Sequence, residues 1–322
     1  MEYILIAIAV IAGLFLIYTV AGTVLGTMMA IVRVPEKKNR KKEENQPLLY
    51  DAVYGKKLSE MKAEGLEWLK NRPFENHTIK TFDGLTLRGK FYKTENARAT
   101  VMLVHGYRSW PERDFGTVVK YFGENGFNIF MYDRRAHGKS DGRYITFGVL
   151  DRYDLRDWTV YVDALCENRL PILWDGISMG GATVCMASSL ELPENLKAIV
   201  ADCPYTTPKE EIRYSMSHYY HIPPFPLIYT VDWAARLVAK YGFTECDSRK
   251  EVAKTKIPVF FAHGQADNFV PHYMGKEIYD ACSSPKEFFS VPDAIHGFSY
   301  IVATEEYQRR LTDFLERNKF FG

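Results

Sequence analysis

The sequence predicts an α/β fold in which helices flank a mostly parallel sheet, with a helical cap insertion and an N-terminal transmembrane helix. Three observations support this class. β-rich and helical runs alternate from Thr100 to Ala201, an uncharged apolar run occupies Tyr3 to Val32, and Gly176-Ile177-Ser178-Met179-Gly180 joins a strand-like run to a helix-like run. With 322 residues, of which 47% are hydrophobic, the chain can form one large core with accessory segments.

Residues 1–32 are expected to form an uncleaved membrane anchor. As a helix, the uncharged run of about 30 residues would extend about 45 Å, whereas the hydrocarbon core of a bilayer is roughly 30 Å thick. A cleaved signal peptide would have a positive start and a shorter apolar core, but this chain carries Glu2 at its start. The basic residues that follow the run are Arg33, Lys37, Lys38, Arg40, Lys41 and Lys42. This asymmetry predicts a single-pass membrane protein whose C-terminal domain is cytoplasmic.

Two features beside the anchor have alternative interpretations. Gly22 and Gly26 form a G-x-x-x-G pattern that could let two such helices approach closely, although glycine is frequent in spanning helices and a lone helix is the simpler expectation. The basic residues lie in a linker that we assign to 33–50. They could touch anionic lipid headgroups or could simply be a solvated flank. A helix predicted from Asp51 to Leu69 then begins the globular domain, residues 51–322.

The sheet of this domain is expected to begin with a hairpin. His77 to Phe82 and Leu85 to Tyr92 are strand-like and flank Asp83-Gly84, which is a strong turn signal. Alternating runs follow, and such alternation indicates βαβ units and a parallel sheet. The predicted strands are Thr100–Val104, Phe127–Tyr132, Pro171–Ile177 and Ala198–Ala201, and the predicted helices lie near Asp114–Asn125, Leu150–Glu167 and Gly180–Leu190.

An insertion interrupts the alternation after Asp202, and we assign a cap to about 204–250. Tyrosines, other aromatic residues and prolines are numerous there, which favours short helices over a disordered loop. Such a cap would present aromatic side chains toward an apolar ligand, although the same side chains could simply attach the cap to the body. The remaining predicted elements are the strand Ile257–Ala262, the helix Pro271–Cys282, the strand Lys286–Val291 and the closing helix Ala303–Arg317.

Charge and cysteine content exclude several classes of function. Lysine and arginine number 41 against 40 acidic residues, so no global positive field would attract nucleic acid. The five cysteines are odd in number and have no C-x-x-C spacing, which argues against a disulfide framework or a zinc site and favours a reducing compartment. His218 and His221 are spaced like metal ligands, but without an accompanying carboxylate or cysteine we interpret them as cap residues. We therefore expect neither a metal nor another cofactor.

Ser178 is the candidate nucleophile. The glycines two residues before and after it allow a sharp turn from strand to helix, which leaves the hydroxyl exposed. A serine near neutral pH needs a base within hydrogen-bond reach and a third group that fixes the tautomer of that base. His296, in a short loop after the last strand, is the best-placed base, and Asp267 is the preferred acid. Asp202 also follows a strand and is the alternative acid.

Two backbone amides are expected to form an oxyanion hole. The first is the amide of Met179, at the positive end of the helix that follows the turn at Ser178. The second is the amide of Tyr107, in the turn after a buried strand. His105 is expected to brace this turn. His263 and His272 flank the acid, but their positions at a strand end and a helix start favour packing roles.

Five segments together resemble the alpha/beta-hydrolase family, and more narrowly its membrane-anchored bacterial branch of serine aminopeptidase-like and acyl-ester hydrolases. These segments are His105-Gly106-Tyr107, Asp133-Arg134-Arg135-Ala136-His137-Gly138-Lys139-Ser140, Gly176-Ile177-Ser178-Met179-Gly180, His263-Gly264-Gln265-Ala266-Asp267 and Asp293-Ala294-Ile295-His296-Gly297. From about residue 74 onward, the resemblance implies the triad Ser178, Asp267 and His296 with oxyanion donors at Tyr107 and Met179. Ala136 stands where relatives often have glycine, which reduces the conformational freedom of that loop.

The expected activity is hydrolysis of a carboxylic ester through an acyl-enzyme intermediate. The aromatic cap and the anchor favour an apolar acyl or alkoxy group, in a small-molecule or lipid-like ester. An aminopeptidase or amidase on the same triad is the alternative, and it would require an acidic cap residue to hold a free amine. The candidates for that role are Glu210, Glu211 and Asp232. A non-catalytic, membrane-tethered binding protein is a third hypothesis, against which the complete triad argues.

Overall fold

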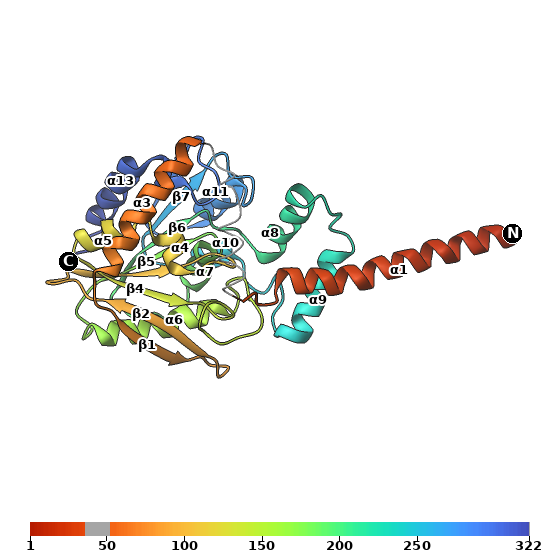
Figure 1. Cartoon of the computed structure of the whole chain (residues 1–322), viewed down its shortest axis with the longest axis horizontal. Coiled ribbons are helices and arrows are strands. Elements are labelled where there is room, and N and C mark those ends of the chain that lie inside the picture. Colours follow the sequence, from red (N-terminus) through yellow and green to blue (C-terminus); the bar gives the residue numbers. More distant parts are fainter. Residues whose placement is uncertain (36–51, 322) are drawn as a thin grey trace.

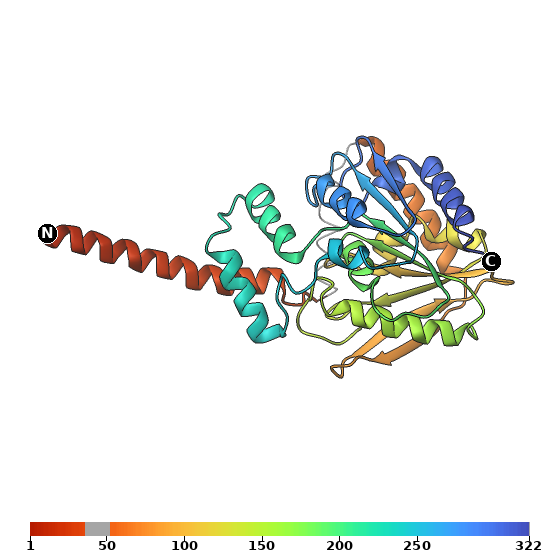
Figure 2. The same ribbon diagram turned by 180° about the vertical axis from the view of Figure 1, so that it is seen from behind.

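A long N-terminal helix projects from a globular body in the computed structural model, which describes residues 1–35 and 52–321 (Figure 1). Helix α1 (Glu2–Ala30) is 29 residues long, and it is long and apolar enough to cross a membrane. Figure 2 shows from behind that only the C-terminal part of α1 approaches the rest of the chain. Most of the predicted basic linker lies outside the described residues.

The described part of the body is built on one eight-stranded sheet with the order β1-β2-β4-β3-β5-β6-β7-β8. The strands are β1 (Glu75–Lys80), β2 (Thr86–Tyr92), β3 (Ala99–Val104), β4 (Phe127–Asp133), β5 (Ile172–Ile177), β6 (Leu196–Asp202), β7 (Val259–Gly264) and β8 (Lys286–Val291). β2 pairs antiparallel with β1 and with β4, and the other neighbouring pairs are parallel. The predicted mostly parallel sheet and its opening hairpin are therefore confirmed.

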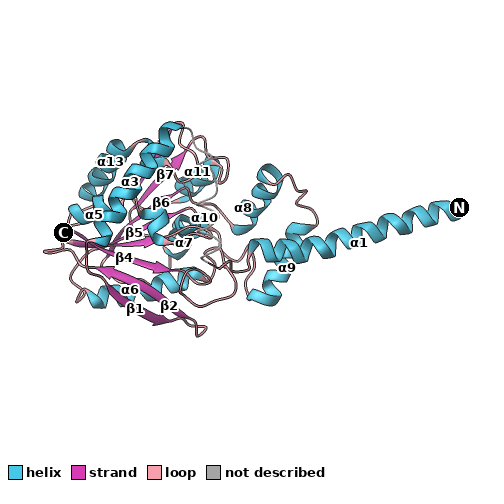
Figure 3. Cartoon of the chain, viewed as in Figure 1, coloured by secondary structure: helices cyan, strands magenta, loops and turns pink. Residues whose placement is uncertain are grey.

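Helices cover both faces of the sheet (Figure 3). Along β3, Val101 and Leu103 pack in a core with helices α3 (Ala52–Lys70), α5 (Val119–Glu124) and α13 (Thr304–Arg317). Met102 and Val104 point to the other core, which is formed with α6 (Asp151–Leu165), α7 (Met179–Ala187), α10 (Ser248–Val252) and α11 (His272–Ala281). The short α12 (Ser299–Val302) precedes α13. Burial on both faces explains why the central strands, such as β3 and β7, are mostly apolar.

One predicted helix is wrong in its extent. Instead of a single helix near Asp114–Asn125, the chain forms α4 (Pro111–Phe115) and α5, with Gly116 as the C-cap of α4. A side chain at Gly65 of α3 would overlap the carbonyl oxygen of Gly116. The break therefore lets the two backbones approach closely, and glycine is also a poor helix former.

The insertion between β6 and β7 forms the cap. It contains α8 (Pro208–Tyr214), a π-helical turn η1 (Ser215–Tyr219) and α9 (Leu227–Ala239), and it ends at α10. Its aromatic residues fall into two groups. Tyr205, Tyr241 and Phe243 are buried and attach the insertion to the body, whereas others are exposed. The exposed aromatic residues are Tyr219, Tyr220, Phe225, Tyr229 and Trp233.

The C-terminal end of α1 is part of the folded body. Ile31 is fully buried, its carbonyl accepts a hydrogen bond of 2.7 Å from the Ile145 amide, and Val32 forms a β-bridge with Tyr144. Arg33, which we assigned to the linker, donates from its amide to the Arg143 carbonyl at 2.8 Å. The C-terminal end of α1 is thus held directly against the body.

The five cysteines are free thiols, as expected from their number and spacing. Four of them are buried, namely Cys185, Cys203, Cys246 and Cys282, and Cys166 is half-buried. They therefore pack as small apolar side chains.

Candidate active site

The turn at Ser178 has the geometry that its flanking glycines predict. Ser178 connects β5 to α7 with φ +58° and ψ −119°, a conformation that costs a residue with a Cβ about 1–3 kcal/mol. A side chain at Gly180 would overlap the Val104 carbonyl, and one at Gly176 would come within 2.5 Å of the Gly180 carbonyl oxygen. The Ser178 amide donates to the Asp202 carbonyl at 2.8 Å, which fastens the turn to β6.

A continuous chain of hydrogen bonds joins the three candidate triad residues. The Ser178 hydroxyl lies 2.8 Å from His296 Nε2, and His296 Nδ1 lies 2.8 Å from Asp267 Oδ2. The other oxygen of Asp267 accepts hydrogen bonds of 2.9 Å from the Phe269 and Val270 amides. With Nδ1–H donating to the carboxylate, Nε2 is free to accept the serine proton, which is the arrangement that general-base catalysis requires.

Burial and charge act in opposite directions on this pair. Burial by itself would raise the pKa of Asp267, but the imidazoles of His296 and His263 outweigh it and hold that pKa well below its ordinary value. Burial likewise disfavours a charged His296, but the Asp267 carboxylate outweighs it and raises the pKa of His296 well above its ordinary value. Asp267 is therefore a carboxylate at neutral pH and stabilises an imidazolium beside it.

The alternative acid, Asp202, makes different contacts. Its carboxyl accepts a hydrogen bond of 3.2 Å from the Ser299 hydroxyl, and in the described part of the chain it makes no hydrogen bond to His296. Burial raises the pKa of Asp202 to about 6. Asp267 rather than Asp202 thus has the geometry of the orienting acid.

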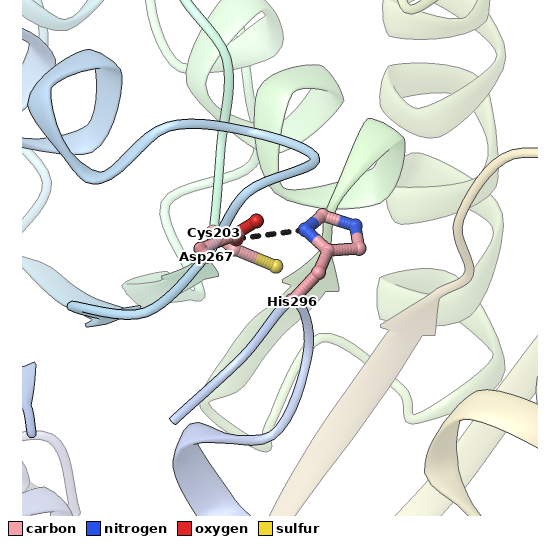
Figure 4. A group of neighbouring side chains, drawn as sticks. All are labelled: Cys203, Asp267 and His296. Carbon is pink, nitrogen blue, oxygen red and sulfur yellow. Dashed lines mark hydrogen bonds and ion pairs between the residues drawn. The ribbon is translucent and has the colours of Figure 1, made fainter. Parts of the chain in front are cut away.

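Cys203, which the sequence did not single out, lies beside the pair (Figure 4). Its Sγ, a carboxylate oxygen of Asp267 and a ring nitrogen of His296 all lie within 4.8 Å of one another. Burial raises the pKa of the Cys203 thiol to about 12, so it stays protonated, and its two neighbours, His296 Nδ1 and Asp267 Oδ2, are already bonded to each other at 2.8 Å. The contact is better explained as packing against the imidazole.

Buried polar groups brace the loop that follows β3. His105 Nδ1–H donates to the Gly106 carbonyl at 2.9 Å, and its Nε2 accepts from the Arg134 amide at 3.2 Å, which confirms the bracing role predicted for it. Two further braces were missed. Asp114 accepts from the Gly106 amide at 2.8 Å, and His137 Nε2 accepts from the Arg108 amide at 3.0 Å. Asp114 acts from the short helix that follows the loop and His137 from the loop after β4, and neither position carries a recognisable sequence signature.

This bracing presents the candidate oxyanion donors next to the nucleophile. A Cβ placed on Gly106 would lie 3.4 Å from the Cβ of Ser178, so the loop contacts the elbow directly. The amides on either side of Tyr107 are occupied by Asp114 and His137. Among described residues, no hydrogen-bond acceptor is found for the amides of Tyr107 and Met179. Two unused amides beside the nucleophile can stabilise a developing oxyanion.

The side chains of this loop also reach the C-terminal end of α1. The Tyr107 hydroxyl lies 2.8 Å from the carbonyl oxygen of Ala30 and 3.0 Å from that of Met29. Arg108 donates to the Met29 carbonyl at 2.7 Å. These donors satisfy carbonyls that the helix terminus leaves without intrahelical partners. This candidate oxyanion loop is therefore tied to α1.

Glu211 is the one acidic cap candidate with a buried carboxyl group. Its Oε1 accepts from the Ser215 hydroxyl at 2.9 Å, and its Oε2 has no hydrogen-bond partner among described residues. Burial raises the pKa of Glu211 to about 8, and the charges of His296 and Asp267 also act on it. Glu210 forms an ion pair with Arg249, and Asp232 forms one with Arg236.

The remaining histidine candidates are distributed as expected. His263 is fully buried and its Nε2 lies 2.9 Å from the Val270 carbonyl, which is a packing role behind Asp267. His272 begins α11. His218 and His221 are exposed on the cap, where His218 stacks on Tyr214 at a centroid distance of 4.3 Å.

Comparisons with known proteins agree with this architecture. Residues 95–245 match the family model described as serine aminopeptidase, S33. An uncharacterized protein of Bacillus subtilis, YqkD, is 24% identical over 236 residues, which are 72% of this chain and 76% of that protein. An uncharacterized membrane protein of Saccharomyces cerevisiae is 22% identical over 77% of this chain and 81% of its own length. A solved esterase structure from Pyrococcus furiosus aligns with a TM-score of 0.63 and 24% identity, covering 78% of this chain and 94% of that one.

The fold and the comparisons together define the class: the chain has the alpha/beta-hydrolase fold. Within that class, it is similar over residues 95–245 to the serine aminopeptidase-like family, as the sequence motifs indicated.

Proposed function

We propose that this protein is a serine hydrolase that cleaves a carboxylic ester through an acyl-enzyme. The observation that carries the proposal is the continuous hydrogen-bonded chain Ser178, His296 and Asp267 at a strained elbow. Backbone strain at a non-glycine residue persists where the surrounding structure enforces it, and it is concentrated at functional sites.

Each proposed step uses a contact described above. Ser178 Oγ attacks the ester carbonyl while its proton passes to His296 Nε2, and the amides of Tyr107 and Met179 stabilise the resulting oxyanion. The imidazolium then donates this proton to the departing alkoxide, which leaves an acyl group on Ser178. A water molecule, deprotonated by His296, attacks the acyl group, and the imidazolium then returns this proton to Ser178 Oγ as the carboxylic acid leaves. Asp267 keeps the imidazole in the productive tautomer throughout.

The apolar cap and the N-terminal helix favour an apolar ester. We propose that α1 anchors the protein as a single membrane span and that the basic residues after it keep the catalytic domain on the cytoplasmic side. Membrane anchoring is supported by the length and composition of α1 and by the similarity to a yeast membrane protein. The similarity to a solved esterase is consistent with ester hydrolysis. The substrate would then be a small-molecule or lipid-like ester.

The test is the turnover of a short-chain aryl ester by the full chain in detergent, compared with Ser178→Ala. We expect the substitution to reduce kcat by about 10⁶-fold, while the thermal unfolding transition stays nearly unchanged. Substantial activity in a folded Ser178→Ala protein would overturn the proposed mechanism.

Glu211 favours one alternative, an aminopeptidase or amidase on the same triad. A buried carboxyl group with a free oxygen could hold the amine of an amino-acid amide, because an ammonium partner would stabilise its ionised form. The variant Glu211→Gln separates the two functions. If the natural substrate carries a free amine, hydrolysis of an amino-acid amide falls much more than hydrolysis of an aryl ester. If the natural substrates are esters without an amine, Glu211→Gln changes the hydrolysis of the amino-acid amide and of the aryl ester by the same factor.

A further inference from the structure

Helix α9 of the cap has an apolar stripe on its exposed face. The stripe consists of Phe225, just before the helix, and of Tyr229, Trp233 and Leu237, at intervals of four residues. These side chains are 69%, 57%, 64% and 56% exposed. A four-residue interval places them on one face, and a helix on a water-facing surface would carry polar residues there. The opposite face is also apolar, since Leu227, Val231 and Ala235 are buried. The exposed stripe therefore needs an apolar neighbour.

The buried face of α9 packs against the anchor helix. A Cβ on Gly22 would come within 2.6 Å of Leu227 Cδ2, and a Cβ on Gly26 within 3.0 Å of Val231 Cγ2. Between the glycines, the Thr23 hydroxyl donates to the Thr230 hydroxyl at 2.6 Å. The G-x-x-x-G pattern thus receives a helix of the same chain, where the sequence had suggested a second copy or no partner. Both ribbon views show α9 crossing the C-terminal part of α1 (Figures 1 and 2).

The length of α1 sets the depth of this contact. At 1.5 Å per residue, Gly22 lies about 30 Å along the helix from Glu2, which is the thickness of the hydrocarbon core. The segment from Gly22 to Ala30 continues for about 12 Å, into and past the headgroup layer on the catalytic-domain side. A helix that contacts Gly22 and Gly26 therefore lies at the membrane interface.

We infer that α9 lies in the membrane interface beside α1, with the stripe Phe225, Tyr229, Trp233 and Leu237 immersed in lipid. The occupant of this surface is the bilayer itself. Tyrosine and tryptophan are the residues that membrane interfaces favour, because their rings are amphipathic. Lys209, whose Nζ lies 4.4 Å from the Tyr229 ring centroid, is placed where anionic headgroups would be met.

The inference extends the proposed function and rests on it for its consequence. Because α9 belongs to the cap, and because the oxyanion loop binds the end of α1, the candidate active site is held next to the bilayer. The substrates would then be esters that partition into the membrane, and they would reach Ser178 along the lipid-facing side of the cap.

Quenching by brominated lipids tests the location of α9 without using enzyme activity. The full chain is reconstituted in phosphatidylcholine vesicles with and without bromine on the acyl chains, and tryptophan emission is compared between wild type and Trp233→Phe. We expect Trp233→Phe to remove most of the quenching by brominated lipid. The matched control Trp68→Phe, on α3 in the body, should leave it unchanged. Equal quenching in wild type and Trp233→Phe would overturn the inference, including the case in which a second copy covers the stripe.

A second measurement tests the consequence for substrates. Leu237→Glu should lower the hydrolysis of a long-chain ester in vesicles, relative to that of a soluble aryl ester in the same sample, by about fivefold. This factor corresponds to about 1 kcal/mol of activation free energy. The control is Val160→Glu on α6, where the side chain is 54% exposed on the body. If Leu237→Glu leaves the ratio of long-chain to aryl ester hydrolysis unchanged, access from the membrane is contradicted. If the wild type hydrolyses neither ester, the proposed function is refuted instead.

Discussion

The two buried aspartates, Asp267 and Asp202, make different contacts, so their substitution by asparagine should have different effects on activity. In Asp267→Asn, one side-chain oxygen must still accept the two backbone amides that now bind Oδ1 at 2.9 Å. The new NH2 group then faces His296 Nδ1, which lies 2.8 Å from Oδ2, and His263 Nε2, which lies 3.3 Å from it. A donor facing Nδ1 favours the tautomer with its proton on Nε2, and that nitrogen can no longer accept the proton of Ser178.

The expected loss is about 10⁴-fold in kcat, which corresponds to about 5.4 kcal/mol of activation free energy. The matched control is Asp202→Asn. Its carboxyl contacts Ser299, so kcat should fall less than about tenfold. The assay is steady-state hydrolysis of an aryl ester by both purified variants, with circular dichroism as a check on folding. A larger loss in Asp202→Asn than in Asp267→Asn would refute the assignment of the acid.

Three further predictions concern the elbow, the base and the oxyanion loop. Ser178→Gly should lack activity, as Ser178→Ala does. Because glycine relieves the strain at φ +58°, its free energy of unfolding in denaturant should exceed that of Ser178→Ala by about 1 kcal/mol. A less stable glycine variant would show that the turn is not strained. The neighbouring carboxylate outweighs burial and raises the pKa of His296, and only the neutral imidazole acts as a base. The value of kcat/KM should therefore fall with decreasing pH through a midpoint above 6.5. A midpoint below 6.5 would contradict the role of His296 as the base. Tyr107→Phe keeps the backbone donor but removes the hydroxyl contacts with Met29 and Ala30. Its free energy of unfolding should fall by about 1 kcal/mol, while kcat falls only a few-fold. A loss of kcat as large as that of Ser178→Ala would assign the hydroxyl a direct role.

The sequence predicted those parts of the site that depend on local constraints. The glycines around Ser178 are required by close backbone contacts, those of Gly176 within the turn and those of Gly180 with the end of β3, and both lie two residues from Ser178, so the pattern is visible in the sequence. Likewise, parallel strands end at a common edge, which brings the residues after β5, β7 and β8 together. The sequence favours Asp267 over Asp202, but both lie at strand ends on that edge, and the side-chain contacts distinguish them directly.

Tertiary contacts determined what the sequence did not predict. The partner of Gly22 and Gly26 is α9, more than 200 residues away in the chain, and a G-x-x-x-G pattern does not specify which helix it receives. The break at Gly116 depends on its contact with α3. Cys203 directly follows β6 and is bonded to β7, which places it beside His296 and Asp267, whereas Glu211 is placed by helix α8 of the insertion.

The central claim is that Ser178 is a nucleophile activated by His296 and Asp267. Its most direct test is to label the full chain with a fluorophosphonate probe and to locate the adduct by peptide mass spectrometry. The account predicts a single adduct on Ser178, strongly reduced in Asp267→Asn and absent in Ser178→Ala. An adduct on another serine, or no adduct in a folded protein, would contradict it.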